Sequence, residues 1–396
     1  MKKDIKQQSI ALHKKHKGKL EISSKVLLKN KDDLSLAYTP GVAAVCRLIA
    51  SDKKVAYTHT IKSNSVAVVS DGSAVLGLGN IGPEAAMPVM EGKAILFKKF
   101  GNVDAYPICL ATQDTEEIIK TVKYIAPGFG GINLEDISAP RCFEIEARLK
   151  KELDIPVFHD DQHGTAIVVL AALINALKVS KKKISEARVV INGAGSAAIA
   201  VTKLLLSAGV TGKNVVMVDS IGAIFAGRGN MNPYKSEIAK LTNSEKITGG
   251  LEEAVKGRDV FIGVSVDNVL KPEWVATMAD KPIVFAMANP DPEISYETAK
   301  KTKIAVFGTG RSDYPNQINN VLAFPGIFRG ALDSGAKQIT EEMKLGAARA
   351  IASLVSVREL DAECIMPKPF DPRVAAVVAR AVKKAAKPAR LSPSLV

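Results

Sequence analysis

Short runs of β-branched and other apolar residues alternate with longer amphipathic or apolar stretches along most of the 396-residue chain. The short runs predict strands, and the stretches between them have the length of helices. This alternation is typical of parallel sheets with helices packed on their faces, so we predict an α/β fold. The predicted strands span 66–71, 106–110, 132–136, 155–160, 188–193, 215–220, 259–264, 282–288 and 303–308.

The pattern divides the chain near residue 160. A long apolar stretch predicts a helix that begins near Gly164 and bridges two α/β units. The polar segment 178–188 then leads into a fresh strand at Arg188. Domains usually hold about 150 residues, so this length fits two or three of them. We predict an N-terminal domain over residues 1–160 and a second domain, with additional C-terminal helices, over residues 161–396.

Composition excludes several classes of protein. Hydrophobic residues make up 47% of the chain and charged residues 24%, which excludes disordered and collagen-like chains. The longest apolar run, Ile167–Leu177, is shorter than the roughly 20 residues of a membrane span, and no secretory signal is evident. We therefore expect a cytoplasmic protein without a membrane partner. Zinc and disulfide frameworks are not expected, because the four cysteines are dispersed: Cys46, Cys109, Cys142 and Cys364.

Charge favours anionic partners without choosing among them. Lys and Arg number 54 against 41 Asp and Glu, giving a formal net charge of +13. Nucleic acid, acidic lipid, and small carboxylates or phosphates all fit such a charge. Aromatic residues are only 5% of the chain, and no RNA- or DNA-binding module is recognisable. We therefore expect small anions and no nucleic acid.

The segment RVVINGAGSAAIAV reads as a strand, a glycine-rich turn and a helix. Gly193 suits the tight turn, Gly195 allows backbone N–H groups to approach a pyrophosphate, and Ala198 takes the third small position. A packing turn of small residues is the alternative. The strand before it and the helix after it favour the nucleotide interpretation, and hence a Rossmann-type second domain.

Asp219 ends the next predicted strand, 26 residues after Gly193. A carboxylate at that place binds the ribose hydroxyls of NAD and repels the 2′-phosphate of NADP. This arrangement favours NAD. NADP stays open, because three residues nearby could hold a phosphate: Ser220, Arg228 and Lys235.

Four carboxylates follow two neighbouring predicted strands: Glu135 and Asp136 after one, Asp160 and Asp161 after the next. The carboxyl ends of parallel strands meet at one edge of a sheet, where ligands bind. Carboxylates gathered there repel one another unless a cation intervenes, and oxygen ligands favour Mg²⁺ or Mn²⁺. The alternative is that they cap or complement helix N-termini. For the flanking His159 and His163 we expect hydrogen bonding and packing.

Two further residues suggest chemistry. Lys93 lies in an apolar helical run, where desolvation would lower its pKa toward the value of a general base. A surface lysine with a buried stem is the alternative. Tyr38 precedes a Pro-Gly turn, and its alternative is a half-buried aromatic residue with a satisfied hydroxyl.

Seven segments in one order resemble the malic enzymes of the short bacterial type: LAYTPGVA, VVSDGSAVLGLGNIGPEAAMPVMEGKAILF, INLEDI, VFHDDQHGTA, NGAGSAA, AMANPDPE and GRSDYPNQINNVLAFPGIFRGALD. The similarity runs from about Leu36 to Asp333 and resumes over 369–373. It implies oxidative decarboxylation of L-malate to pyruvate and CO₂, with NAD(P)⁺ and Mg²⁺ or Mn²⁺. It also implies a homodimer or a dimer of dimers.

The resemblance assigns roles position by position. Tyr38 matches the general acid, Lys93 the general base, and Asp160 the carboxylate that supports the lysine. No counterpart is evident for the arginine that binds substrate before GLGNIG in the long eukaryotic members. The remaining matches are the metal ligands Glu135, Asp136 and Asp161, the malate-binding amides Asn289 and Asn320, and the cofactor-binding residues Gly193, Gly195, Ser196, Ala197, Ala198, Asp219 and Asn289.

Four other functions account for part of the sequence pattern. A malolactic-type enzyme, which converts malate to lactate with bound NAD, would share the same scaffold. A plain malate dehydrogenase would not require the carboxylate cluster. A nucleic-acid-binding protein lacks support beyond its charge. A catalytically silent regulatory homologue is disfavoured by the intact Tyr38, Lys93 and carboxylates.

Overall fold

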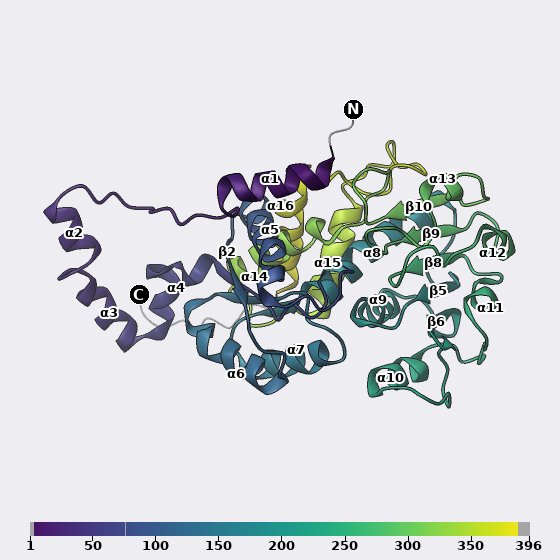
Figure 1. The fold of residues 1–396 in the computed structure, drawn as a ribbon, viewed down its shortest axis with the longest axis horizontal. Coiled ribbons are helices and arrows are strands. Elements are labelled where there is room, and N and C mark those ends of the chain that lie inside the picture. Colours follow the sequence, from purple (N-terminus) through teal and green to yellow (C-terminus); the bar gives the residue numbers. More distant parts are fainter. Residues whose placement is uncertain (1–3, 76, 387–396) are drawn as a thin grey trace.

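The chain folds into two α/β units, each built around one sheet. The structure is a computed structural model and describes residues 4–75 and 77–386. Figure 1 shows the first sheet toward the left and the second toward the right, with helices packed around each. The predicted α/β fold with two domains is confirmed. All nine predicted strands form, each within about three residues of its expected ends.

The first sheet is parallel throughout, with the order β2-β1-β3-β4. Helices α6 and α7 cover one of its faces through side chains such as Ile118 and Ile145. Helices α5 and α8 pack on the other face. The elements are β1 (Ser65–Ser70), α5 (Pro83–Gly101), β2 (Asp104–Cys109), α6 (Thr115–Ile125), β3 (Gly131–Leu134), α7 (Arg141–Glu152) and β4 (Val157–His159).

Helix α8 (Asp160–Val179) joins the two sheets and begins four residues earlier than predicted. His159 is still extended, and Asp160 and Asp161 form the first helical turn, where carboxylates complement the helix dipole. By length and composition, α8 and the stretch Lys31–Ser51 could each cross a membrane. Most of α8 is buried inside the protein, whereas no residue in the Lys31–Ser51 window is buried.

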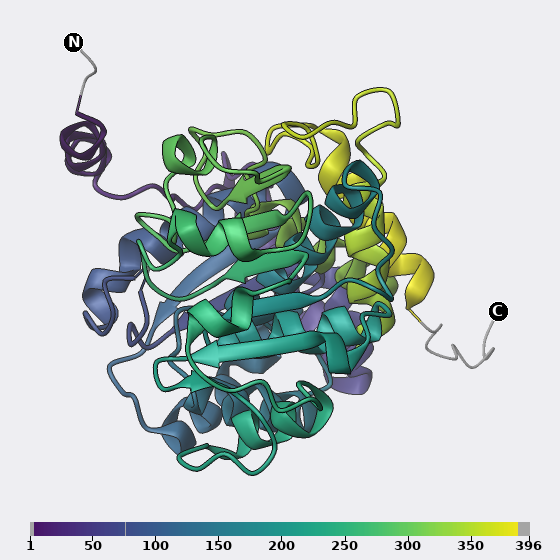
Figure 2. The ribbon, with the colours of Figure 1, turned by 90° about the vertical axis from the view of Figure 1, so that its right-hand side faces the viewer.

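The second sheet has the order β10-β9-β8-β5-β6-β7, and Figure 2 views it with helices before and behind. Its strands are parallel except for the short β7, which was not predicted and pairs antiparallel with β6. The strand order reverses at β5, and such a switch point forms the ligand crevice of open α/β sheets. The elements are β5 (Val189–Asn192), α9 (Ser196–Ser207), β6 (Val215–Asp219), β7 (Gly222–Ala223), α10 (Pro233–Leu241), α11 (Leu251–Val255), β8 (Val260–Gly263), α12 (Pro272–Thr277), β9 (Ile283–Ala286), α13 (Tyr296–Ala299) and β10 (Val306–Thr309).

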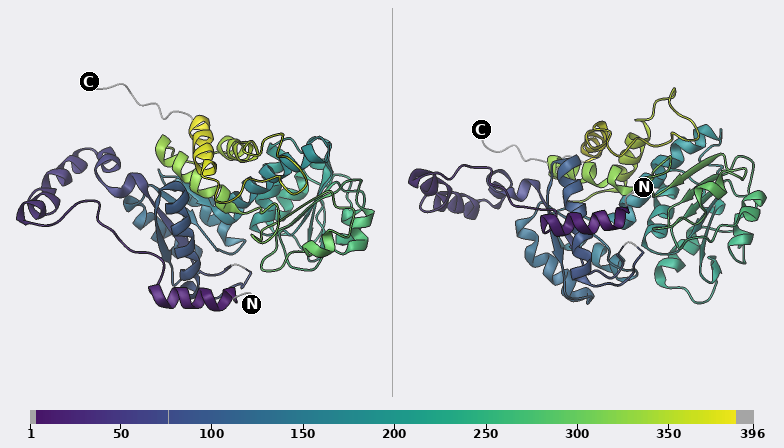
Figure 3. Two further views of the ribbon diagram at one scale, coloured as in Figure 1. Left: turned by 90° about the horizontal axis from the view of Figure 1, so that it is seen from above. Right: turned by 45° about the horizontal axis from the view of Figure 1, so that its top comes forward.

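The C-terminal helices α14 (Phe324–Ser334), α15 (Glu341–Ala352) and α16 (Arg373–Ala385) pack close to α5 and α8 (Figure 3). The ring centroids of Phe97 on α5 and Phe324 on α14 lie 4.7 Å apart. One hydrophobic core therefore runs from the first sheet to the second. A division at residue 160 separates the two sheets, but it does not separate this core.

The N-terminal segment stands apart from that core. Helix α1 (Ile5–His16) precedes Lys19, which binds α5 through Glu91 and the Pro88 carbonyl. Residues 20–61, called the arm here, include α2 (Lys31–Ala37), α3 (Val42–Ser51) and α4 (Ala56–His59), none of which contains a buried residue. Figures 1 and 3 show α2 and α3 projecting away from the second sheet.

Candidate active site

The predicted carboxylates meet because β3 and β4 are adjacent parallel strands. Glu135, Asp136 and Asp161 each present an oxygen, and these three oxygens all lie within 4.8 Å of one another. The Asp136 N–H also donates to Asp161 Oδ2 at 2.8 Å. This spacing suits a shared hard cation, and among the described residues it is the one such group of metal-ligating side chains.

Lys93 reaches this cluster from α5. Its Nζ lies 2.6 Å from Asp160 Oδ2 and 2.8 Å from Glu135 Oε1. The Phe324 ring covers the ammonium, with 4.2 Å between Nζ and the ring centroid. All four side chains are buried. The lysine is therefore fixed by one carboxylate of each strand end and shielded from solvent.

Electrostatics at the cluster correct one prediction. Burial alone would lower the pKa of Lys93, but the carboxylates of Asp160 and Glu135 outweigh it and raise that pKa above its ordinary value. The expected lowering was wrong, because the surroundings of this lysine are anionic as well as apolar. Burial also raises the pKa of Asp160 to about 7 and that of Glu135 above its ordinary value. Four ionised carboxylates with one ammonium leave an anionic site whose charge a divalent cation would largely offset.

Both histidine residues contact the carboxylate of Glu146, His163 through its ring and His159 through its backbone N–H. His163 Nε2 lies 2.9 Å from Glu146 Oε2, and the His159 N–H donates to Glu146 Oε1 at 3.1 Å. Burial lowers the pKa of His163 to about 4, so the ring is neutral at pH 7. The predicted hydrogen-bonding role is confirmed for His163 and wrong for the His159 side chain, whose two ring nitrogens are buried without a hydrogen-bond partner among the described residues.

The glycine-rich turn lies between β5 and α9. Gly193 has φ 127°, and a Cβ there would lie 2.8 Å from the Val264 carbonyl oxygen, so only glycine fits. Gly195 is the N-cap of α9, and a Cβ there would meet nothing within 4 Å. Ala198 is buried where helix meets strand. The space beside Gly195 at the start of α9 is therefore open, which a pyrophosphate bound to the first N–H groups of the helix would require.

Asp219 lies beside this turn, since the Gly193 N–H donates to the carbonyl of Val218 at 2.8 Å. Its carboxylate is already engaged by Arg228 and Lys235, each at 2.6 Å. Burial alone would raise the pKa of Asp219, but hydrogen bonds from these two cations hold it well below its ordinary value. Two of the three residues that kept NADP open in the sequence, Arg228 and Lys235, thus pair with Asp219, and the choice between NAD and NADP stays a prediction.

The two predicted amides come from different segments of the chain, one after β9 and one before α14. Asn320 begins a short 3-10 turn, and its Cβ lies close to Gly164, one turn into α8. Asn289 follows β9 and approaches both Gly77 of the first domain and Gly310. No hydrogen bond joins the two amides within the described residues, so a ligand would have to bridge them.

Tyr38, the predicted general acid, lies on the arm and not at the carboxylate cluster. It is the C-cap of α2, is 66% exposed, and belongs to the projecting arm (Figure 1). Sequence reasoning could not foresee this, because a motif does not show which way a segment leaves the fold.

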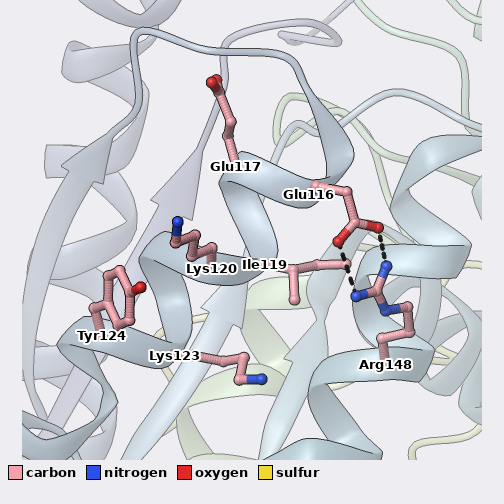
Figure 4. A pocket seen from close by; sticks show the side chains of 7 residues that line it. All are labelled: Glu116, Glu117, Ile119, Lys120, Lys123, Tyr124 and Arg148. Atoms are coloured by element: carbon pink, nitrogen blue, oxygen red, sulfur yellow. Dashed lines mark hydrogen bonds and ion pairs between the residues drawn. The ribbon is translucent and has the colours of Figure 1, made fainter.

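A separate depression of about 410 Å³ lies between α6 and α7. Its walls include Lys120, Tyr124 and the ion pair of Glu116 with Arg148 (Figure 4). None of the site residues predicted from the sequence lines this depression. It is therefore distinct from the carboxylate cluster and the nucleotide turn.

Comparison with known proteins agrees with this geometry. A family model described as malic enzyme, N-terminal domain, matches residues 17–150, and one described as malic enzyme, NAD binding domain, matches residues 162–387. The chain belongs to the malic enzyme family. It is 60% identical to a bifunctional malic/malolactic enzyme of Bacillus subtilis over 96% of this chain and 93% of that protein. Identity to an NAD-dependent malic enzyme of Geobacillus stearothermophilus is 62%, over 93% and 77% of the two chains.

Solved malic enzymes share the fold of this family member. The NAD-dependent malic enzyme of Thermotoga maritima has a TM-score of 0.91 and 52% identity, over 94% of this chain and 98% of that one. The malic enzyme of Pyrococcus horikoshii has a TM-score of 0.93 and 52% identity, over 97% and 90%. The resemblance inferred from the motifs is thus confirmed, and the chain is an oxidoreductase of this family.

Two contacts of this malic enzyme site were missed from the sequence. Phe324, which covers Lys93, lies in the recognised AFPG segment, but nothing in that segment pairs it with a lysine 231 positions earlier. Asn133 donates to Glu135 Oε2 at 2.8 Å and orients it. The available signal was the position of Asn133 in β3, where a polar residue lies between the apolar Ile132 and Leu134.

Proposed function

We propose that this chain catalyses the oxidative decarboxylation of L-malate to pyruvate and CO₂ with reduction of NAD(P)⁺. The observation that carries the proposal is the buried Lys93 held between Asp160 and Glu135, next to a carboxylate triad. A base and a cation-binding triad in one place suit an enzyme that oxidises a hydroxyl and then stabilises an enolate. A plain dehydrogenase has no use for the triad.

Each residue has a role in this proposal. Asn289, after β9, and Asn320, beside the first turn of α8, hold the malate carboxylates. Lys93 accepts the C2 hydroxyl proton, and Asp160 keeps its amine aimed at that oxygen. Tyr38 returns a proton to C3 after CO₂ leaves. The turn from Gly193 through Ala198 holds the pyrophosphate of the nucleotide, whose nicotinamide takes the hydride.

Glu135, Asp136 and Asp161 would hold Mg²⁺ or Mn²⁺, which fits their buried oxygens and the unbalanced charge of the cluster. Such a cation would supply Lewis acidity to the bound substrate. Carboxylates that shared a cation would attract the Lys93 ammonium less strongly. The raised pKa of Lys93 would then be lower, closer to the range in which the amine can accept a proton.

We further infer that the protein is a homodimer in which the arm of one chain brings Tyr38 to the site of the other. Tyr38 cannot donate a proton from its exposed place on the arm. Among the described residues, 24 large hydrophobic side chains are exposed, and 14 of them lie between Ile5 and Ile61. That density is far above what a monomer leaves in water, and it marks an interaction surface.

A second copy suits the arm better than a membrane does. The apolar side chains of the arm are interrupted by charged residues, including Lys29, Lys31, Asp32 and Asp33, which a bilayer core disfavours. A partner that carries the same site also explains why a tyrosine of the family motif lies on the arm. Cytoplasmic localisation remains our expectation.

The function is tested by mixing the purified protein with L-malate, Mn²⁺ and either NAD⁺ or NADP⁺, and measuring reduced nicotinamide, pyruvate and lactate. We expect equal amounts of pyruvate and reduced nicotinamide, and none without Mn²⁺. Lactate without free NADH would instead establish the malolactic reaction, which the name of the Bacillus subtilis relative favours. A folded protein that produces neither product would refute both.

The dimer is tested by light scattering of the wild type and of Leu27→Asp. We expect twice the 42.1 kDa chain mass for the wild type and a shift toward the monomer for the variant. Val357→Asp is the matched control, because Val357 is 90% exposed outside the arm. A monomeric wild type, or one that sediments with lipid vesicles, would refute the dimer.

A further inference from the structure

Asp71 is a buried carboxylate that directly follows β1, at the sheet edge where the carboxylate cluster lies. Its Oδ2 lies 3.0 Å from Nη2 of Arg141, the first residue of α7. Its Oδ1 accepts from the backbone N–H of Ser73 at 3.0 Å and from Ser73 Oγ at 2.5 Å. A buried ion pair is costly to desolvate, and the reaction proposed above does not use this one. Its role must therefore be sought in what it holds.

Ser73 links this ion pair to the segment that carries Asp136. Its Oγ accepts from the Ser138 N–H at 2.9 Å, and the N–H of the next residue, Ala74, donates to the Asp136 carbonyl at 3.0 Å. Arg141 Nη2 also donates to Ser138 Oγ at 3.1 Å. Residues 73–74 therefore hold residues 136–138 through two hydrogen bonds, and the buried ion pair fixes both segments.

Asp136 has a backbone that needs such support. Its φ is 55°, in the left-handed region that residues with a side chain rarely adopt. A residue keeps this conformation where its surroundings impose it. The N–H of Asp136 donates to Asp161 within the cluster, whereas its carbonyl is held by Ala74 from outside the cluster. The direction in which the Asp136 carboxylate points therefore depends on the 73–74 segment.

We propose that Ser73 is a positioning residue for the cation site, because its hydroxyl connects the buried ion pair of Asp71 to the segment of Asp136. The inference deepens the proposed function and rests on it. Residues that orient a metal ligand without touching the metal change metal affinity by roughly 10- to 100-fold when they are replaced. Without the hydroxyl, segment 136–138 loses one of its two anchors. The Asp136 oxygen is then held less firmly within 4.8 Å of the oxygens of Glu135 and Asp161.

A role in fold stability alone predicts a different result. Loss of the hydroxyl would then lower the melting temperature in EDTA and leave the affinity for Mn²⁺ unchanged. Ser65→Ala is the matched control. Ser65 is also buried and begins the same strand, β1, at the end away from the cluster, where its Oγ donates to the Gly128 carbonyl at 3.2 Å.

The test measures binding of Mn²⁺ rather than turnover. The full-length protein is titrated with Mn²⁺ in the absence of malate and nucleotide, and free Mn²⁺ is followed by electron paramagnetic resonance. Ser73→Ala should raise the Kd for Mn²⁺ about tenfold, and Ser65→Ala should leave it unchanged. An unchanged Kd in Ser73→Ala, or an equal rise in Ser65→Ala, would overturn the inference.

A second variant tests whether Asp71 acts through Ser73. Asp71→Asn should raise the Kd by a smaller factor than Ser73→Ala, because asparagine keeps an oxygen for Ser73 but loses the charge that binds Arg141. The double variant should bind Mn²⁺ no more weakly than Ser73→Ala alone, since both changes break one linkage. Effects that multiply in the double variant would show that Asp71 acts separately and would overturn the linkage.

Failure of the inference and failure of the proposed function give different results. Equal Mn²⁺ binding by the wild type and Ser73→Ala, in a protein that oxidises malate, would overturn the positioning role alone. A wild type that binds no Mn²⁺ would refute the cation site and the positioning role together. The expected loss of Mn²⁺ affinity, in a protein whose wild type does not oxidise malate, would refute the function and leave the positioning role standing.

Discussion

At the scale of residues, Lys93 is a buried ammonium whose partners are carboxylates, and its removal has two separable effects. Lys93→Met should reduce the turnover of malate by about 10²- to 10⁴-fold, because the base is lost. It should also lower the free energy of unfolding without metal by about 3 kcal/mol, since Asp160 and Glu135 lose their counter-ion.

Added Mn²⁺ should then raise the melting temperature of Lys93→Met more than that of the wild type, because the carboxylates have no other cation. Melting curves with Mn²⁺ and with EDTA measure this difference. Lys99→Met, on the exposed face of the same helix, serves as the control for a lost lysine. Near-normal malate oxidation by Lys93→Met would exclude Lys93 as the base.

His163 should make the fold sensitive to mild acid. Burial lowers its pKa to about 4, whereas an unfolded histidine titrates near 6.5. Between pH 6.5 and pH 4 the imidazole of His163 is therefore protonated in the unfolded chain but neutral in the folded chain. The free energy of unfolding falls by up to about 3 kcal/mol as the pH drops through this range. Glu146, with a lowered pKa, adds to this loss only below about pH 4.3.

Urea unfolding at pH 7.5 and pH 5 measures the effect. His163→Gln should show a smaller difference between the two midpoints than the wild type. His16→Gln, at an exposed position of α1, should retain the wild-type difference. An unchanged pH dependence in His163→Gln would show that other groups are responsible.

At this scale the expected lowering of the Lys93 pKa failed, and the reason is charge. The helical pattern around Lys93 shows that the side chain is buried, but not that two carboxylates from other strands surround it. For Asp219 the sequence offers the carboxylate and the nearby cations Arg228 and Lys235, but not that both cations bind it. A pKa depends on these long-range partners, so the identity of a residue was predictable and its protonation was not.

At the scale of elements, two helix-interior glycines should respond oppositely to alanine. Gly164 lies in α8, where a Cβ would overlap Asp160 Oδ1 and approach Asn320 Cβ to 3.1 Å. Gly346 lies in α15, where the nearest atom to a Cβ would be 3.7 Å away. Alanine gains about 1 kcal/mol of helix propensity at either position.

Gly346→Ala should therefore raise the melting temperature without changing turnover. Gly164→Ala should lower malate turnover by at least tenfold, because Asp160 and Asn320 are displaced from Lys93 and the substrate. Thermal melts and initial rates compare the two variants. Equal activity in both would mean that the first turn of α8 does not position the site.

The strands were predictable because apolar runs between polar turns have few alternative structures. Each run, from 66–71 to 303–308, became a parallel strand, and all of these strands except the half-buried edge strand β2 are largely buried. The ends of the elements were harder to predict. Helix α8 starts at Asp160 because acidic residues are favoured in the first turn of a helix, although the apolar periodicity begins only near Gly164. The short β7 offers two residues of pattern, too few to detect.

At the scale of the whole molecule, the sequence places Tyr38 in a motif but cannot show where its segment goes. The arm leaves the fold instead of packing on the sheet that follows it in the chain. A segment whose apolar residues are covered by another chain has the same pattern as one covered by its own. The motif therefore predicts a site role for Tyr38, but it cannot predict which chain of a dimer would supply the residue.

Mixing two inactive variants tests whether the site is shared. Tyr38→Phe keeps Lys93, and Lys93→Ala keeps Tyr38. If the arm crosses to the partner, a mixed dimer contains one site with both native residues and one site with neither. Random exchange of chains makes half of the dimers mixed, so the mixture should recover about a quarter of wild-type malate oxidation.

If each chain supplies its own Tyr38, every site in the mixture keeps one defect and no activity returns. The mixture is prepared by joint refolding or co-expression, and a tag on one variant allows the mixed dimer to be isolated and assayed alone. Tyr38→Phe mixed with Leu27→Asp is an informative control, because a chain that cannot dimerise cannot deliver its tyrosine. Recovery that tracks the fraction of mixed dimer would assign Tyr38 to the partner's site, since no rearrangement within one chain could restore both residues together.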